Sequence, residues 1–207
     1  MRTASTHPRP HRARRGEGER LRDEILDATE ALLVDTGNAG AISVRRVAEA
    51  VGRTPPSIYL HFATKDVLMQ AVCQRQFDAL SERFGTAIAD VSDPVEQIRR
   101  MARQYVEFAL DHPEHYRLLF MSGQRTEVKD LEGLRLSECF GMLHAAVDAA
   151  LASGRFGPGD STLIALALWT AVHGLASLLI AQDLEFPPLD DYLGQVLDQN
   201  LAGLLAR

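Results

Sequence analysis

The stretch Ile42–Met69, ISVRRVAEAVGRTPPSIYLHFATKDVLM, predicts two short helices joined by a tight turn. Apolar residues recur at helical spacing from Val44 to Val51. Gly52 follows at the position where a helix commonly ends in a left-handed residue, a conformation that glycine adopts without steric cost. The first helix of the pair is therefore expected to end at this glycine.

The second helix of the pair is predicted to begin directly after the turn. Thr54 is a suitable N-cap, and Pro55 and Pro56 occupy first-turn positions whose N–H groups would have no partner inside a helix. Ile58 and Phe62 give this helix an apolar inward face. Two helices of about two turns each with a glycine turn between them are typical of a helix-turn-helix unit.

The polar side chains of this unit have the chemistry needed to enter a groove of DNA. Hydroxyl, phenol and imidazole groups reach phosphates or base edges on short stems, and a capped helix start such as Thr64-Lys65 offers a cation and free N–H groups to a phosphate. We expect Arg45 to read a guanine edge, and the more apolar Pro56 and Leu60 to meet thymine methyls. The expected DNA-contacting residues are Ser43, Val44, Arg45, Arg53, Thr54, Pro55, Pro56, Ser57, Tyr59, Leu60, His61 and Lys65.

A family resemblance rests on these same positions. The motif YxHFxxK (Tyr59, His61, Phe62, Lys65), preceded by Ser43-Val44-Arg45, Val47-Ala48 and Gly52, resembles the N-terminal DNA-binding domain of the TetR/AcrR family of bacterial transcription regulators. The resemblance implies a homodimer held by a four-helix bundle, a near-palindromic double-stranded operator, and most often repression. Half-sites read by such a dimer lie ~34 to 36 Å apart, or a multiple of that distance.

Bulk composition limits the class of protein. The chain has 207 residues, of which 46% are hydrophobic and 24% charged, as in ordinary globular proteins. Cys73 and Cys139 are too few for a disulfide framework or a zinc site, which suits a reducing cytoplasm. No apolar run reaches about 18 residues without polar breaks, and no signal segment is evident, so membrane spanning and secretion are not expected.

Charge is distributed unevenly along the chain. The net charge is -6, but residues 1–70 hold eleven Lys and Arg against nine Asp and Glu, which gives +2. The remaining 71–207 hold eleven against nineteen, which gives -8. Because an acidic surface repels nucleic acid, any DNA contact is expected on the first third of the chain.

We predict three regions from these patterns. Residues 1–19, rich in Arg and Pro, lack apolar periodicity and form either a DNA-contacting basic arm or a solvated tail. Residues 20–70 form the DNA-binding domain, whose first helix ends near Thr36. A long helix from Lys65 to about residue 89 then leads into a helical effector-binding and dimerisation domain over 71–207.

The second domain reads as helical throughout. Helices are expected from Asp93, in a short segment around Tyr116 to Met121, over about 128–152, over about 160–181, and in a last helix that extends to Leu205. The whole chain is therefore predicted to be all-α, with about nine helices.

The last two helices are the expected dimer interface. Residues 160–181 are apolar nearly all round, which indicates burial on more than one side. A broad apolar stripe follows from Leu189 to the C-terminus. We expect the homodimer to form through residues 160–205.

An effector site is expected in the same domain. Trp169, His173 and Gly174 resemble a Trp and His-Gly pattern found in one C-terminal subtype of TetR-like regulators, although core packing is an alternative for Trp169 and His173. Gly174 costs a helix ~1 kcal/mol relative to Ala and is expected to allow a close helix approach or an open cavity. The expected lining residues for a small, mostly apolar effector are Met101, Tyr105, Phe108, Phe120, Met142, Trp169 and His173.

Catalytic readings have little support. His112 and His115 flank Pro113 and are expected to diverge, so no metal site is predicted, and no cofactor or nucleophile motif occurs. The sequence favours a ligand-responsive, DNA-binding transcriptional regulator that is not an enzyme and acts in the cytoplasm. The alternatives are a helical small-molecule-binding enzyme or a dimeric scaffold with a degenerate DNA-binding domain.

Overall fold

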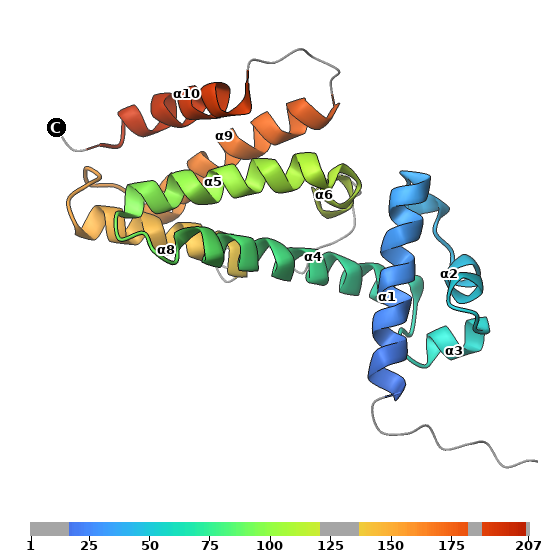
Figure 1. Cartoon of the computed structure of the whole chain (residues 1–207). Coiled ribbons are helices and arrows are strands. Elements are labelled where there is room, and N and C mark those ends of the chain that lie inside the picture. The colour runs from blue at the N-terminus through green and yellow to red at the C-terminus, as the bar shows by residue number, and fades with distance from the viewer. Residues whose placement is uncertain (1–16, 121–136, 182–187, 206–207) are drawn as a thin grey trace, which may run out of the picture. The chain divides into compact units, whose positions relative to one another are not determined.

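The structure is a computed structural model that describes residues 17–120, 137–181 and 188–205. These ranges contain nine α-helices and one 3-10 turn and no strand, which confirms the all-α prediction (Figure 1). The chain divides into two compact units, Met1–Leu68 and Met69–Arg207, and the division falls inside one long helix.

The first unit is built from helices that pack against one another. Its described elements are α1 (Glu17–Thr36), the 3-10 turn η1 (Ala39–Ala41), α2 (Val44–Ala50), α3 (Pro55–Tyr59) and the first turn of α4 (Lys65–Ile88). Helix α1 packs against α2, and α2 packs against α3 (Figure 1). Ile25 of α1, Val47 of α2 and Ile58 of α3 are fully buried, and each such side chain stabilises the unit by ~1.5 to 3 kcal/mol.

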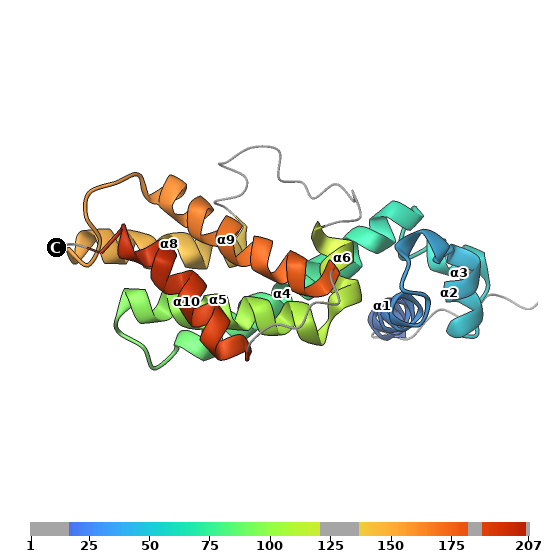
Figure 2. The same ribbon diagram turned by 90° about the horizontal axis from the view of Figure 1, so that it is seen from above.

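The second unit is a bundle centred on α5. Its described elements are the rest of α4, then α5 (Pro94–Asp111), α6 (Pro113–Phe120), α8 (Glu138–Ala152), α9 (Ser161–Ala181) and α10 (Leu189–Ala202). Helix α5 packs against α6, α8 and α9, while α9 also packs against α8 and α10 (Figures 1 and 2). The buried side chains of α5 are Val95, Ile98, Met101, Ala102, Tyr105, Val106, Phe108 and Ala109.

Several predicted boundaries differ from the structure. Helix α1 begins at Glu17, so residues 17–19 belong to this helix and not to the basic arm, whose residues 1–16 lie outside the described ranges. The helix expected over 128–152 is described only from Glu138, and Met121 also lies outside the described part. Helix α10 ends at Ala202, and Leu205 instead forms an isolated bridge with Phe156.

Helix α9 keeps one face exposed within its unit. Leu163 and Leu178 are 58% and 53% exposed, and the small residues Ala167, Thr170 and Gly174 between them are exposed as well. Their spacing of three or four residues places them on one face of the helix. By length and composition α9 is apolar enough to cross a membrane, a test that core helices of soluble proteins also pass.

Candidate DNA-binding surface and effector site

The turn between α2 and α3 is closed by backbone hydrogen bonds. Gly52 has a φ of 62°, as expected for the residue after the helix. The Gly52 N–H donates to the Glu49 carbonyl at 3.2 Å, and the Arg53 N–H donates to the Ala48 carbonyl at 2.8 Å. At the other end of α2, the Ser43 hydroxyl caps the helix by accepting from the Arg46 N–H at 3.3 Å. These local bonds fix where the two helices meet.

Helix α3 has only five residues and is held by two buried side chains. Ile58 and Phe62 are 0% and 2% exposed, whereas Tyr59 and Leu60 between them are 51% and 86% exposed. A short helix anchored in this way presents a phenol and an apolar side chain to solvent on a rigid support. At this exposure the Leu60 side chain contributes little to packing, so it is accessible to a binding partner.

The arginines of α2 divide into one exposed and one tethered side chain. The Arg45 Nε donates to Glu49 Oε1 at 3.0 Å, and these side chains are 83% and 64% exposed. Arg46 instead turns back, and its Nη1 donates to the Ala41 carbonyl at 3.3 Å. Arg45 is therefore the arginine of α2 that remains accessible, and Glu49 orients it through the helical i,i+4 spacing.

Lys65 has a structural contact that the sequence did not predict. Its Nζ donates to the Ala39 carbonyl at 3.2 Å and ties the start of α4 to η1. The Thr64 hydroxyl caps α4 by accepting from the Val67 N–H at 3.1 Å, as predicted. Because an ammonium has three donors, Lys65 keeps others for a phosphate.

The structure brings the predicted DNA-contacting residues together in the first unit. All lie at α2, the glycine turn, α3, or the segment that leads into α4. Val44, Pro55, Ser57, His61 and Lys65 are partly buried, whereas the others are exposed. Glu49 was not among the predicted residues, although its position four residues after Arg45 on the same helix is a signal that the sequence contains.

Five aromatic rings from three helices form the second candidate site, and Phe77 of α4 and Phe140 of α8 lie against two of them, Phe120 and Trp169, with centroids 5.8 and 6.1 Å away. This aromatic cluster comprises Tyr105 of α5, Tyr116 and Phe120 of α6, and Trp169 and His173 of α9. Neighbouring ring centroids lie 5.0 to 6.4 Å apart, as for Tyr116 with Phe120 and for Phe120 with Trp169. These separations are typical of edge-to-face and offset aromatic pairs.

Hydrogen bonds converge on the imidazole at the centre of the aromatic cluster. The hydroxyls of Tyr105 and Tyr116 both lie 2.8 Å from His173 Nδ1. The Tyr116 hydroxyl also lies 3.1 Å from the His173 carbonyl oxygen and 3.0 Å from the Ser177 hydroxyl. Since Tyr105 and Tyr116 are 5% and 0% exposed, these bonds satisfy polar groups that water does not reach.

Burial keeps the aromatic cluster uncharged near neutral pH. It lowers the pKa of His173 below its usual 6.5 and raises the pKa of Tyr105 well above 10. Burial is also the largest cause of the raised pKa of Tyr116, and hydrogen bonding with Ser177 and Tyr105 opposes this shift. All three side chains are therefore neutral at pH 7.

Four of the seven predicted effector-lining residues belong to the aromatic cluster: Tyr105, Phe120, Trp169 and His173. Phe108 is buried against the ring of His112, and Met101 is buried in α5, so neither takes part in the ring contacts of the cluster. Met142 is partly buried on α8, also without such a contact. The sequence reasoning missed Tyr116 and Ser177, although Ser177 follows His173 by four residues on the same face of α9.

The two histidines beside Pro113 do not diverge as expected. The rings of His112 and His115 lie edge to face with centroids 5.7 Å apart. His115 is 7% exposed, and both of its ring nitrogens are buried without a hydrogen-bond partner. Among the described residues, no group of three or more His, Cys, Asp or Glu side chains is placed to hold a metal ion.

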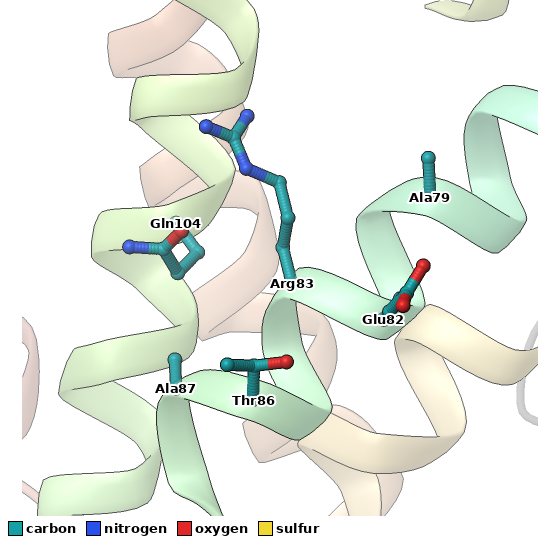
Figure 3. A pocket seen from close by; sticks show the side chains of 6 residues that line it. All are labelled: Ala79, Glu82, Arg83, Thr86, Ala87 and Gln104. Atoms are coloured by element: carbon teal, nitrogen blue, oxygen red, sulfur yellow. The ribbon is translucent and has the colours of Figure 1, made fainter.

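A separate hollow of about 360 Å³ lies between α4 and α5 (Figure 3). It is lined by Ala79, Glu82, Arg83, Thr86, Ala87 and Gln104. The Arg83 Nη2 donates to Asp111 Oδ2 at 2.8 Å, so this guanidinium is already paired. The hollow shares no residue with the aromatic cluster, and three of its lining side chains are exposed, so it lacks the enclosure typical of an effector site.

Known proteins match both units. The family of bacterial regulatory proteins called tetR matches residues 25–72, and the tetracyclin repressor-like C-terminal domain matches residues 98–202. The nucleoid occlusion factor SlmA of Escherichia coli O81 (strain ED1a) is 24% identical over 176 residues, which are 83% of this chain and 88% of that protein.

Solved structures of other proteins share the fold, and two of them show the extent of the similarity. One is a protein with unknown function from Rhodococcus sp. RHA1, with a TM-score of 0.77, 26% identity, and coverage of 97% of this chain and 100% of the other. The other is RolR in complex with resorcinol, with a TM-score of 0.67, 15% identity, and coverage of 92% and 90%. Together with the exposed helix-turn-helix surface, the two family matches show that the chain belongs to the tetR family of DNA-binding transcriptional regulators.

Proposed function

We propose that this regulator is a homodimeric repressor that binds a near-palindromic operator and is released by a small molecule. One observation supports the DNA-binding part of this proposal. The unit exposes Arg45, Tyr59 and Leu60, while the buried Ile58 and Phe62 hold helix α3 in place. A side chain that reads DNA must be accessible and yet rigidly held, and this unit meets both conditions.

The roles of the individual residues follow from their positions. Arg45 would reach a guanine edge, and Leu60 would contact a thymine methyl. Ser57, Tyr59, His61 and Lys65 would hold phosphates and so set the register of the helix on the duplex. Leu60 in particular has an apolar side chain that is 86% exposed.

The exposed face of α9 supports the proposed homodimer. Leu163 and Leu178 lie at either end of a stripe of small side chains, and a Cβ added at Gly174 would meet no atom within 4 Å. Glycine at an exposed helix position costs stability without a local benefit, unless another helix approaches there. A second copy of α9 would supply that helix, and a two-fold axis through this face would pair two recognition units with two half-sites.

The aromatic cluster supports the proposed effector response. It is an uncharged group of rings with a central imidazole, and α9 contributes Trp169 and His173 to it, beside the exposed stripe that contains Gly174. RolR, which has the same fold, was solved in complex with resorcinol, so a protein of this fold accommodates a small ligand. As tetR-family regulators are soluble cytoplasmic proteins, we assign the protein to the cytoplasm.

A gel-shift titration with the full chain tests the proposed function. The probe is the DNA upstream of the protein's own gene, with unrelated DNA as competitor and a series of salt concentrations. We expect a retarded complex in which two subunits occupy the two half-sites of one operator. Its affinity should fall steeply as the salt concentration rises, because phosphate contacts release counterions. Failure to prefer the upstream DNA over the competitor would refute the regulator and favour the enzyme or scaffold readings.

A further inference from the structure

We propose that the aromatic cluster binds a neutral, planar aromatic molecule that carries a hydrogen-bond-accepting oxygen, and that this molecule is the effector. The proposal rests on the proposed function, because it names the ligand class of the same site. Three properties of the described residues carry it: partly exposed rings, no unpaired charge on α6 beside them, and a donor that we assign to His173.

The cluster combines buried rings with partly exposed ones. Tyr105 and Tyr116 are buried, whereas Phe120, Trp169 and His173 are partly exposed. The ring centroids of these three residues lie 6.4 Å (Phe120–Trp169), 5.1 Å (Phe120–His173) and 5.3 Å (Trp169–His173) apart. A planar ligand ring that reaches them would add offset or edge-to-face contacts to a set of rings that is already arranged in this way.

The charged groups nearest to the cluster along α6 are already committed. Arg117, which follows Tyr116 in the chain, pairs with Glu114, and its Nη2 donates to the Ile180 carbonyl at 3.3 Å. The polar members of the cluster are themselves neutral at pH 7. From the described residues of α6, an ionic ligand would therefore gain no partner of opposite charge in exchange for its hydration, a cost that a neutral ligand does not carry.

The tautomer of His173 supplies the specificity. The buried Tyr105 hydroxyl lies 2.8 Å from His173 Nδ1, and we assign this nitrogen as its acceptor. A neutral imidazole that accepts at Nδ1 carries its proton at Nε2. Within the described residues, no side chain or carbonyl accepts a hydrogen bond from this Nε2. The site thus presents an N–H donor beside aromatic rings, which selects an oxygen acceptor and disfavours a cation.

A fluorescence titration reads this site directly, because Trp169 is the only tryptophan of the chain. The full-length protein is titrated with five matched probes: benzyl alcohol, toluene, cyclohexylmethanol, benzoate and benzylammonium. Calorimetric titration of the same probes provides a second readout. We expect benzyl alcohol to bind at least tenfold more tightly than each of the other four. Equal or tighter binding of either ion, or no saturable binding of benzyl alcohol, would overturn the proposal.

The His173→Phe variant tests the donor. It keeps an aromatic ring and removes Nε2–H, so the preference for benzyl alcohol over toluene should fall to below twofold while toluene still binds. The matched control is His112→Phe, since His112 is exposed and lies outside the aromatic cluster. An unchanged preference in His173→Phe, or the same loss in His112→Phe, would overturn the assignment of the donor.

A parallel operator titration separates this proposal from the proposed function. We expect saturating benzyl alcohol to weaken operator binding at least fivefold. If the ligand saturates Trp169 fluorescence but leaves operator affinity unchanged, the effector role is overturned. If the protein does not bind operator DNA at all, the proposed function fails, while the five-probe titration still decides the ligand class.

Discussion

The Arg45→Ala substitution should separate DNA recognition from folding. Arg45 pairs with Glu49 at 3.0 Å, but both side chains are mostly exposed, so the pair stabilises the unit by only ~0.3 to 0.5 kcal/mol. Alanine has the highest helix propensity, which offsets part of that loss. A bidentate arginine–guanine contact contributes ~1 to 3 kcal/mol of discrimination, equivalent to about 5- to 150-fold in affinity at each half-site.

Two measurements on the same preparation test this reasoning. Fluorescence anisotropy at one fixed salt concentration gives operator affinity, and denaturant unfolding gives the free energy of unfolding. Arg103→Ala is the matched control, because Arg103 forms the same i,i+4 pair with Glu107 on α5 at 2.9 Å. We expect a large loss of affinity and relaxed specificity at one operator position for Arg45→Ala alone. Equal losses in both variants, or unchanged affinity in Arg45→Ala, would refute the assignment of Arg45.

Further predictions concern the remaining sites. Lys65→Met should lower the free energy of unfolding by ~1 kcal/mol, because it removes the hydrogen bond to the Ala39 carbonyl; denaturant unfolding measures this change. The same substitution should reduce the salt dependence of operator binding, which a salt series measures. Gly174→Arg should yield a folded monomer in sedimentation analysis, since the new side chain meets open space in its own unit but blocks the proposed dimer face; a dimer that survives would contradict that face. Burial lowers the pKa of His115 below 6.5, so the unfolded chain binds the proton more readily and stability should fall as the pH drops below about 6.5. Thermal unfolding should show a weaker pH dependence in His115→Phe than in His112→Phe, and equal slopes would remove His115 as the cause.

The helix-turn-helix was predictable because its signals are local. Ser43, Gly52 and Pro55 each specify a helix start or end within a few residues, and the structure places the helix boundaries at these positions. The pairing of Arg45 with Glu49 was predictable in the same way, because the two residues lie one helical turn apart. In contrast, Lys65 bonds a carbonyl 26 residues earlier in the chain, and no sequence pattern indicates such a contact.

The candidate effector site was only partly predictable because it is assembled from three distant helices. The resemblance to a TetR-like C-terminal subtype singled out Trp169 and His173, and helical spacing placed Tyr105 on an inward face. They could not show that Tyr116 reaches the same imidazole nitrogen as Tyr105, since this depends on how α5, α6 and α9 pack. Helix α6 follows α5 after the single residue His112. The angle between these two helices is set by tertiary packing and cannot be read from periodicity.

The two proposed interactions of α9 are coupled by the geometry of one helix. Trp169 and His173 face the aromatic cluster, whereas Gly174 and Leu178 lie on the exposed stripe, so both surfaces belong to the same three turns of backbone. A helix moves as a rigid element over this length, and a ligand that shifts the inner face must therefore shift the outer face. The ligand changes the dimer only by the difference between its affinities for the two arrangements, typically ~1 to 3 kcal/mol. Because Tyr105, Tyr116 and His173 are already hydrogen-bonded, a ligand that contacts His173 acts on α5, α6 and α9 together.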